Sequence, residues 1–223
     1  MNRLNFSEAL KYDRRKYFQY YWSLLKTGHI VVFAFVPNND YNSMSIKMCL
    51  FISSLALYFT INALFFNNET MHRIFNDHGK YNIIYQLPQI IYSSLISTVI
   101  SIIMKYLSLS QQEILNLKTF IKSDSLKKSV KELKKRLLIK FILFYLLSYA
   151  LIIFYWIYVS SFCAVYKNTQ KILIVDTIIS FGISLTYPFG YYLIPGIFRI
   201  PALKSKNKKK ECIYKISLFI QLV

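Results

Sequence analysis

Residues 137–165 read LLIKFILFYLLSYALIIFYWIYVSSFCAV, and residues 127–136, just before them, read KKSVKELKKR. The chain thus changes abruptly from a basic run to an apolar, aromatic stretch without Gly or Pro. A helix rises about 1.5 Å per residue, so roughly 20 apolar residues cross a hydrocarbon core of about 30 Å. Covering so long an apolar helix inside a soluble protein would need a much larger chain. We therefore predict that residues 137–165 span a membrane.

The composition of the 223-residue chain also favours a small multi-pass membrane protein. Hydrophobic residues make up 55% and aromatic residues 17%, and the formal net charge is +18. The charges lie in a few blocks instead of on every helix. Three cysteines lie far apart without a CxxC pattern, so neither a disulfide framework nor a zinc site is indicated. The first sixteen residues are basic and lack an apolar region, so we expect no cleavable signal peptide.

Four stretches have the length and hydropathy of membrane spans. They cover residues 48–66, 83–104, 137–165 and 172–198 approximately. We predict an all-α integral membrane bundle of four transmembrane helices with interfacial amphipathic helices, forming one multi-pass domain over residues 1–223. The fourth span contains Pro188 and Pro195, each close to a Gly, and we expect a broken helix there.

The segments between the spans are assigned by charge. Residues 1–47 carry 7 of the 28 Lys and Arg residues, residues 105–140 carry 10 and residues 199–223 carry 7, whereas the other two loops carry 2 each. Basic loops stay in the cytosol, so we predict a cytosolic interfacial segment (1–47), a basic cytosolic loop (105–136) and a basic cytosolic tail (199–223). Both termini are then cytosolic. The sequence leaves open which membrane holds the protein.

Two capping-box patterns lie in the central loop. Ser110-x-x-Glu113 and Ser129-x-x-Glu132 predict two helix starts, the second of them continuous with the third span.

The basic run before the third span is a candidate contact for anionic lipid on the cytosolic side, at roughly 1 kcal/mol per Lys or Arg. Its cationic residues are Lys127, Lys128, Lys131, Lys134, Lys135 and Arg136. The alternative is that they only determine topology. No nucleic-acid-binding motif accompanies the charge, so we expect no nucleic-acid partner.

A face of small residues is the second candidate site. Ser93, Ser97 and Ser101 recur every four residues on the second span, and Gly182, Pro188 and Gly190 lie in the fourth. Such spacing allows close helix packing, and a pore lining is the alternative.

Three polar residues lie inside the spans. Asn62, Lys140 and Asp176 are candidates for a proton or ion relay. The alternative is that Lys140 and Asp176 reach the interface and that Asn62 bonds to a neighbouring helix.

Glu69, His72, Asp77 and His78 share one loop, but their spacing does not identify a metal site. No catalytic motif occurs, so we expect no metal, no cofactor and no enzymatic activity.

Several blocks resemble the carboxy-terminal multi-pass block of large, uncharacterised membrane proteins from protists. They are residues 20–26 (YYWSLLK), 39–43 (NDYNS), 61–66 (INALFF), 85–93 (YQLPQIIYS) and 195–201 (PGIFRIP). The resemblance covers nearly the whole chain. It implies a membrane module without a named activity. It also implies that the chain is either a fragment or a stand-alone short copy, and that an interaction partner lies in the upstream region of such proteins.

The predicted function is a non-enzymatic module that anchors or scaffolds through helix packing and a basic cytosolic face. The alternative is a channel or transporter subunit that uses the broken fourth span and the Ser face of the second. The partners expected are the lipid bilayer, anionic lipids and other membrane helices.

Overall fold

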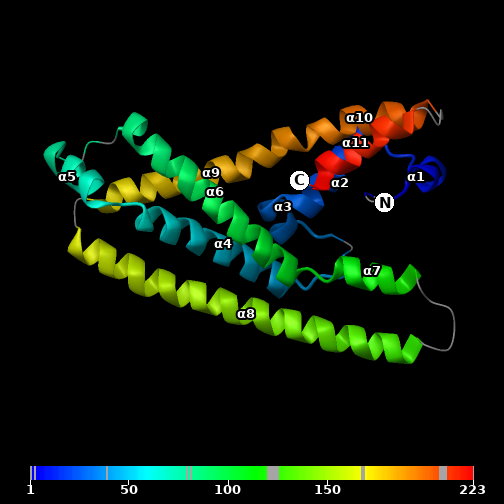
Figure 1. Cartoon of the computed structure of the whole chain (residues 1–223), viewed down its shortest axis with the longest axis horizontal. Helices are drawn as coiled ribbons and strands as arrows, with labels where there is room; N and C mark the ends of the chain where they lie inside the picture. Colours follow the sequence, from blue (N-terminus) through cyan, green and yellow to red (C-terminus); the bar gives the residue numbers. More distant parts are fainter. Residues whose placement is uncertain are drawn as a thin grey trace. The chain divides into compact units, whose positions relative to one another are not determined.

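The computed structural model describes residues 2, 4–38, 40–78, 80, 82–119, 126–166, 169–205 and 210–222. All the elements in this part of the chain are helices, and it contains no strand (Figure 1). Four helices are long and apolar enough to cross a membrane, which confirms the all-α class and the number of candidate spans. Their bounds are Met44–Leu64, Ile83–Ser108, Lys128–Val165 and Gln170–Lys204.

The chain divides into two compact units. Unit 1 combines residues 1–38 with residues 185–223, and unit 2 consists of residues 39–184. The single domain over residues 1–223 stays a prediction beside this division.

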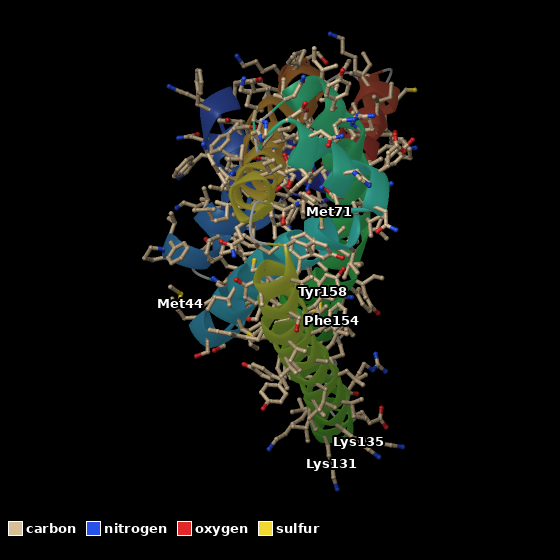
Figure 2. The ribbon with its side chains drawn as sticks, turned by 90° about the vertical axis from the view of Figure 1, so that its left-hand side faces the viewer. Met44, Met71, Lys131, Lys135, Phe154 and Tyr158 are labelled. Atoms are coloured by element: carbon tan, nitrogen blue, oxygen red, sulfur yellow. The ribbon has the colours of Figure 1, made fainter. Side chains whose placement is uncertain are left out.

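Unit 2 contains the longest helices. These are α4 (Met44–Leu64), α5 (Asn68–Asn76), α6 (Ile83–Ser108), α7 (Gln111–Thr119), α8 (Leu126–Val165) and the greater part of α9 (Gln170–Tyr191). In Figure 1, α4, α6 and α8 pack against one another. α9 reaches α4 through Phe181, whose ring lies 5.3 Å from that of Tyr58. An apolar cluster around Ala63, Phe162 and Leu173 closes the end of unit 2 that carries α5, with Met71 and Tyr158 packed against it (Figure 2).

α8 joins the predicted basic loop and the third span in one helix. Its 40 residues rise about 60 Å, since the stretch contains no helix breaker. Because α8 begins at Leu126, Ser129 lies inside the helix and does not cap its start. The first pattern does mark a helix start, because α7 begins at Gln111 and the amide of Ile114 donates to the carbonyl of Ser110. Its two side chains also make contacts with other parts of unit 2. The Ser110 hydroxyl donates to the carbonyl of Tyr41, and Glu113 forms an ion pair with Lys140.

Unit 1 is built from short helices. They are α1 (Phe6–Tyr12), α2 (Tyr17–Gly28), α3 (Ile30–Phe35), the last residues of α9, α10 (Leu193–Lys204) and α11 (Glu211–Leu222). α10 packs against α1, α2 and α11. Two apolar clusters form the core of unit 1. One lies around Phe6, Ala202 and Tyr214, and the other around Tyr20 and Ile200.

The fourth span is interrupted inside the predicted stretch, between Pro188 and Pro195. α9 continues through Pro188 to Tyr191, and the turn falls at Tyr192, before α10 begins at Leu193. A proline removes one backbone donor, and a helix tolerates this loss when the following residues keep their bonds. Here the amide of Tyr192 still donates to the carbonyl of Pro188 at 3.0 Å.

Candidate functional site

The start of α8 carries a group of exposed cationic side chains, which we call the basic end. It comprises Lys128, Lys131, Lys134, Lys135 and Arg136, together with Lys127, whose side chain lies outside the described part of the structure. Figure 2 shows Lys131 and Lys135 at the tip of α8, pointing away from the rest of unit 2. Among the described residues, no ion pair involves any of the five.

Two less exposed lysines of unit 2 are paired with carboxylates. In unit 2, Nζ of Lys140 lies 2.7 Å from Oε1 of Glu113, and Nζ of Lys47 lies 2.8 Å from a carboxylate oxygen of Asp40. Lys140 also donates to the carbonyl of Leu109 at 3.0 Å. Lys140 therefore holds α7 against α8. Acidic partners thus neutralise Lys47 and Lys140, whereas the basic end carries six cationic residues and one carboxylate, Glu132.

The Ser face of α6 points into unit 2. Ser93 and Ser97 are fully buried, and Ser101 is half-buried. The Ser93 hydroxyl donates to Oδ1 of Asn62 on α4 at 2.8 Å. The hydroxyls of Ser97 and Ser101 have no hydrogen-bond partner within the described residues. Ser93 therefore joins α6 to α4. The hydroxyls of Ser97 and Ser101, one and two helical turns further along α6, make no such bond within the described residues.

A cluster of polar side chains from three helices surrounds Asn62, and we call it the polar cluster. Nδ2 of Asn62 donates to the hydroxyl of Ser180 on α9 at 2.8 Å. Nε2 of Gln89 on α6 donates to the Asn62 carbonyl at 3.3 Å and lies 3.5 Å from Oδ2 of Asp176 on α9. Asn62 and Asp176, like Ser93 and Ser180, are fully buried. The interior of unit 2 is therefore polar around Asn62, where α4, α6 and α9 meet.

The residues proposed from the fourth span lie in different surroundings. A Cβ added at Gly182 or at Gly190 would meet no atom within 4 Å, and Pro188 is half-buried inside α9. The structure thus brings Ser93 into the polar cluster of unit 2, whereas Pro188 and Gly190 belong to unit 1.

A small cleft opens beside the polar cluster, between α5 and the start of α6. Its volume is about 30 Å³, and its lining includes Arg73 and Asp77 of α5 and Gln86 of α6. Arg73 lies over the ring of Tyr85, with 4.4 Å from Cζ to the ring centroid. Glu69 pairs with Arg73 at 3.3 Å. The described residues include no group of three or more His, Cys, Asp or Glu side chains that would hold a metal ion.

Unit 1 contains a buried ion pair that the sequence did not reveal. Arg199 of α10 is fully buried and binds Asp13, and its guanidinium carbon lies 4.9 Å and 4.8 Å from the ring centroids of Tyr20 and Tyr214. Arg15 binds the same carboxylate at 2.7 Å. Burial alone raises the pKa of Asp13, but the hydrogen bonds and charges of Arg15 and Arg199 outweigh it and hold that pKa below its usual 3.8.

A scan against protein-family models and searches of curated proteins and of solved structures found no match to the chain. The resemblance to the protist membrane block therefore stays a prediction. The argument for function rests on the contacts described above.

Proposed function

We propose that this chain is a non-enzymatic membrane module, anchored by four spanning helices, that binds anionic lipid headgroups through the basic end of α8. The observation that carries the proposal is the contrast between paired and unpaired lysines among the described residues of unit 2. Lys47 and Lys140 are matched by carboxylates, whereas the exposed cations of the basic end have no acidic partner in the described chain. A lipid phosphate is the anion available beside a span.

The length of α8 supports this assignment. The segment from Leu126 to Arg136 rises roughly 16 Å ahead of the apolar part of the helix. It therefore carries its charges through the headgroup layer, where a Lys or Arg gains about 1 kcal/mol from anionic lipid. In this proposal the basic loop and both termini face the cytosol.

The test measures which lipids the protein retains. The full-length protein is reconstituted in vesicles of equal parts phosphatidylserine and phosphatidylcholine and extracted gently, and the bound lipids are quantified. The wild type should retain phosphatidylserine preferentially. Neutralising two charges in Lys131→Gln/Lys135→Gln should lower this preference by about 2 kcal/mol, or roughly 30-fold. High salt should also lower the preference for phosphatidylserine, because it screens the exposed charges.

The matched control is Lys80→Gln/Lys171→Gln. It removes two exposed charges from other parts of unit 2 and should leave the preference unchanged. Equal preference in the wild type and both variants would refute lipid binding by the basic end.

A channel or transporter subunit is the second candidate. It is favoured by the buried face of α6, where most of the enclosed residues are polar, among them Gln86, Gln89, Ser93 and Ser97. The test is ion flux into vesicles that contain the purified protein, with Ser97→Leu and Pro188→Ala as variants. Flux that either variant alters would support this candidate, and flux no higher than that of empty vesicles would reject it.

A further inference from the structure

We propose that the carboxylate of Asp176 is a proton-binding site inside unit 2, reached from the cleft beside α5 by way of Gln86 and Gln89. The inference goes beyond lipid anchoring and does not depend on the basic end of α8.

The first step is the burial of the carboxylate. Asp176 is fully buried although it lies in the second turn of a helix with the hydropathy of a membrane span. Ile172 and Leu173, one turn earlier, belong to the apolar cluster with Phe162 of α8. An ionised carboxylate is costly in such surroundings, and uptake of a proton removes that cost.

The second step concerns the polar groups near the Asp176 carboxyl. Gln89 can bond to this carboxyl whether it is protonated or ionised. Gln89 has an amide that donates through Nε2 and accepts through Oε1, so it can face a carboxylate or a carboxyl O–H. The hydroxyl of Thr177, adjacent in the chain, is buried and has no hydrogen-bond partner among the described residues. Ser180 and Asn62 are held by each other at 2.8 Å. Rotation of the Gln89 amide thus allows it to face the carboxyl group in either protonation state without moving a helix.

The third step is access. Gln86 lines the cleft, and Gln89 follows it at i+3, on the same face of α6. Gln89 then approaches Asp176 at 3.5 Å. The cleft volume of about 30 Å³ is enough for one or two water molecules, since each needs about 10–15 Å³. The proposed path therefore runs from the cleft along Gln86 and Gln89, on one face of α6, to the buried carboxylate.

Several titratable groups lie at the same end of unit 2 as this path. From α4, α6, α8, α5, the loops after α5 and α8, and α9 itself, they are Tyr58, Tyr85, Tyr92, Tyr158, Tyr166, Cys163, Glu69, His72, Arg73, Asp77, His78, Lys80 and Lys171. Arg73, Asp77 and Lys80 line the cleft itself. The side chains that bond within the polar cluster, Asn62, Ser93 and Ser180, are uncharged.

The proposed step is a simple proton transfer. A hydronium ion in the cleft loses a proton and becomes water, and the carboxylate of Asp176 gains an O–H bond. At higher pH, the proton returns to hydroxide or water along the same path. The net charge of the polar cluster changes by one unit in each direction.

Infrared difference spectroscopy on the full-length protein in vesicles tests the site. Acidification of the folded wild type should produce the C=O stretching band of a protonated carboxyl that is shielded from water. Asp176→Asn should remove this band. Asp77→Asn, which removes an exposed carboxylate at the cleft, should leave it in place. A band that persists in Asp176→Asn, or no such band in the folded wild type at any pH tested, would overturn the proposal.

A second variant keeps the carboxylate and changes the path. In Gln89→Leu the band should still form after a pH jump, but about tenfold more slowly, because one hydrogen-bonding link to a charged group is lost. Gln19→Leu, an exposed amide of α2, is the control. Proton uptake at the wild-type rate in Gln89→Leu would reject the path through Gln86 and Gln89, even if Asp176→Asn did not fold.

Discussion

Arg199 donates from Nε and Nη2 to the same oxygen of Asp13, at 3.1 Å and 2.9 Å, although 186 residues separate the two in the chain. The side chains of both are almost completely shielded from solvent. Nη1 of Arg199 also donates to the carbonyl of Asn2 at 3.1 Å, and Tyr214 donates to the carbonyl of Leu4. The start and the end of the chain are thus folded together in unit 1.

Removing the charge of Asp13 should destabilise unit 1. Asp13→Asn leaves the guanidinium of Arg199 buried without its counter-ion, which costs about 3–5 kcal/mol. The free energy of unfolding in mixed micelles measures the change. Glu8→Gln, which neutralises an exposed carboxylate of α1, is the control and should change stability by less than about 0.5 kcal/mol. An equal effect of the two variants would contradict a structural role for the pair.

The same carboxylate should give unit 1 an acid-sensitive stability. The pKa of Asp13 is lower in the folded protein than its usual 3.8 because Arg15 and Arg199 outweigh the effect of burial. Its contribution is therefore fully present above that usual value and is lost as the pH falls through the lower, folded-state pKa. A pH series of unfolding free energies should show this acid decline in the wild type. The decline should be weaker in Asp13→Asn, and identical curves would contradict the assignment.

Gly28 should not tolerate a methyl group. A Cβ at this position would lie 1.9 Å from Oη and 2.4 Å from Cζ of Tyr192, so the ring would have to move. We expect Gly28→Ala to cost about 1–3 kcal/mol. Gly182→Ala is the matched control, since its Cβ meets nothing within 4 Å, and it should stabilise α9 by up to about 1 kcal/mol. Thermal unfolding of both variants measures whether each substitution lowers or raises the melting temperature. A lower melting temperature for Gly182→Ala would contradict the proposed difference in space between the two glycines.

Asn62 should be the residue of the polar cluster on which packing depends most. Its side chain joins Ser93 of α6 and Ser180 of α9 to α4. Asn62→Ala should cost about 1–3 kcal/mol. Ser94→Ala, at a half-buried serine whose hydroxyl donates to the Ile91 carbonyl of its own helix, should cost little. If the two substitutions lower the melting temperature equally, the interhelical bonds do not stabilise unit 2.

The sequence predicted the long helices well because their signal is local. Hydropathy and length placed the first span at residues 48–66 and the third at 137–165, and the structure has helices over Met44–Leu64 and Leu126–Val165. A charged flank and an apolar stretch can belong to one helix, so the basic run extends α8. The break at Tyr192 lies between the two prolines that predicted it. The helix continues through Pro188 itself, because a proline within a long helix removes one bond without ending it.

The contacts between distant residues could not be predicted in the same way. Asp13 and Arg199 each lie in a segment whose charges look solvated, and no periodicity relates them. Lys140 was expected to reach the interface, but it is paired with Glu113 of α7. Asn62 was predicted to bond to a neighbouring helix, and the structure confirms this for Ser93 and Ser180. A polar residue in an apolar span thus predicts a hydrogen bond to another helix, but it does not identify the partner residue.

The most direct test of the account is the side of the membrane on which three positions lie. The basic end, the tail and α5 are probed by single cysteines: Lys131→Cys, the native Cys212 and Asn76→Cys, with the other native cysteines replaced by Ala. All three positions are exposed. A membrane-impermeant maleimide, added to sealed vesicles of known orientation, should label the first two from the cytosolic side and Asn76→Cys only from the opposite side. Labelling of Lys131→Cys and Asn76→Cys from the same side would contradict the four-span arrangement and, with it, the lipid-binding role of the basic end.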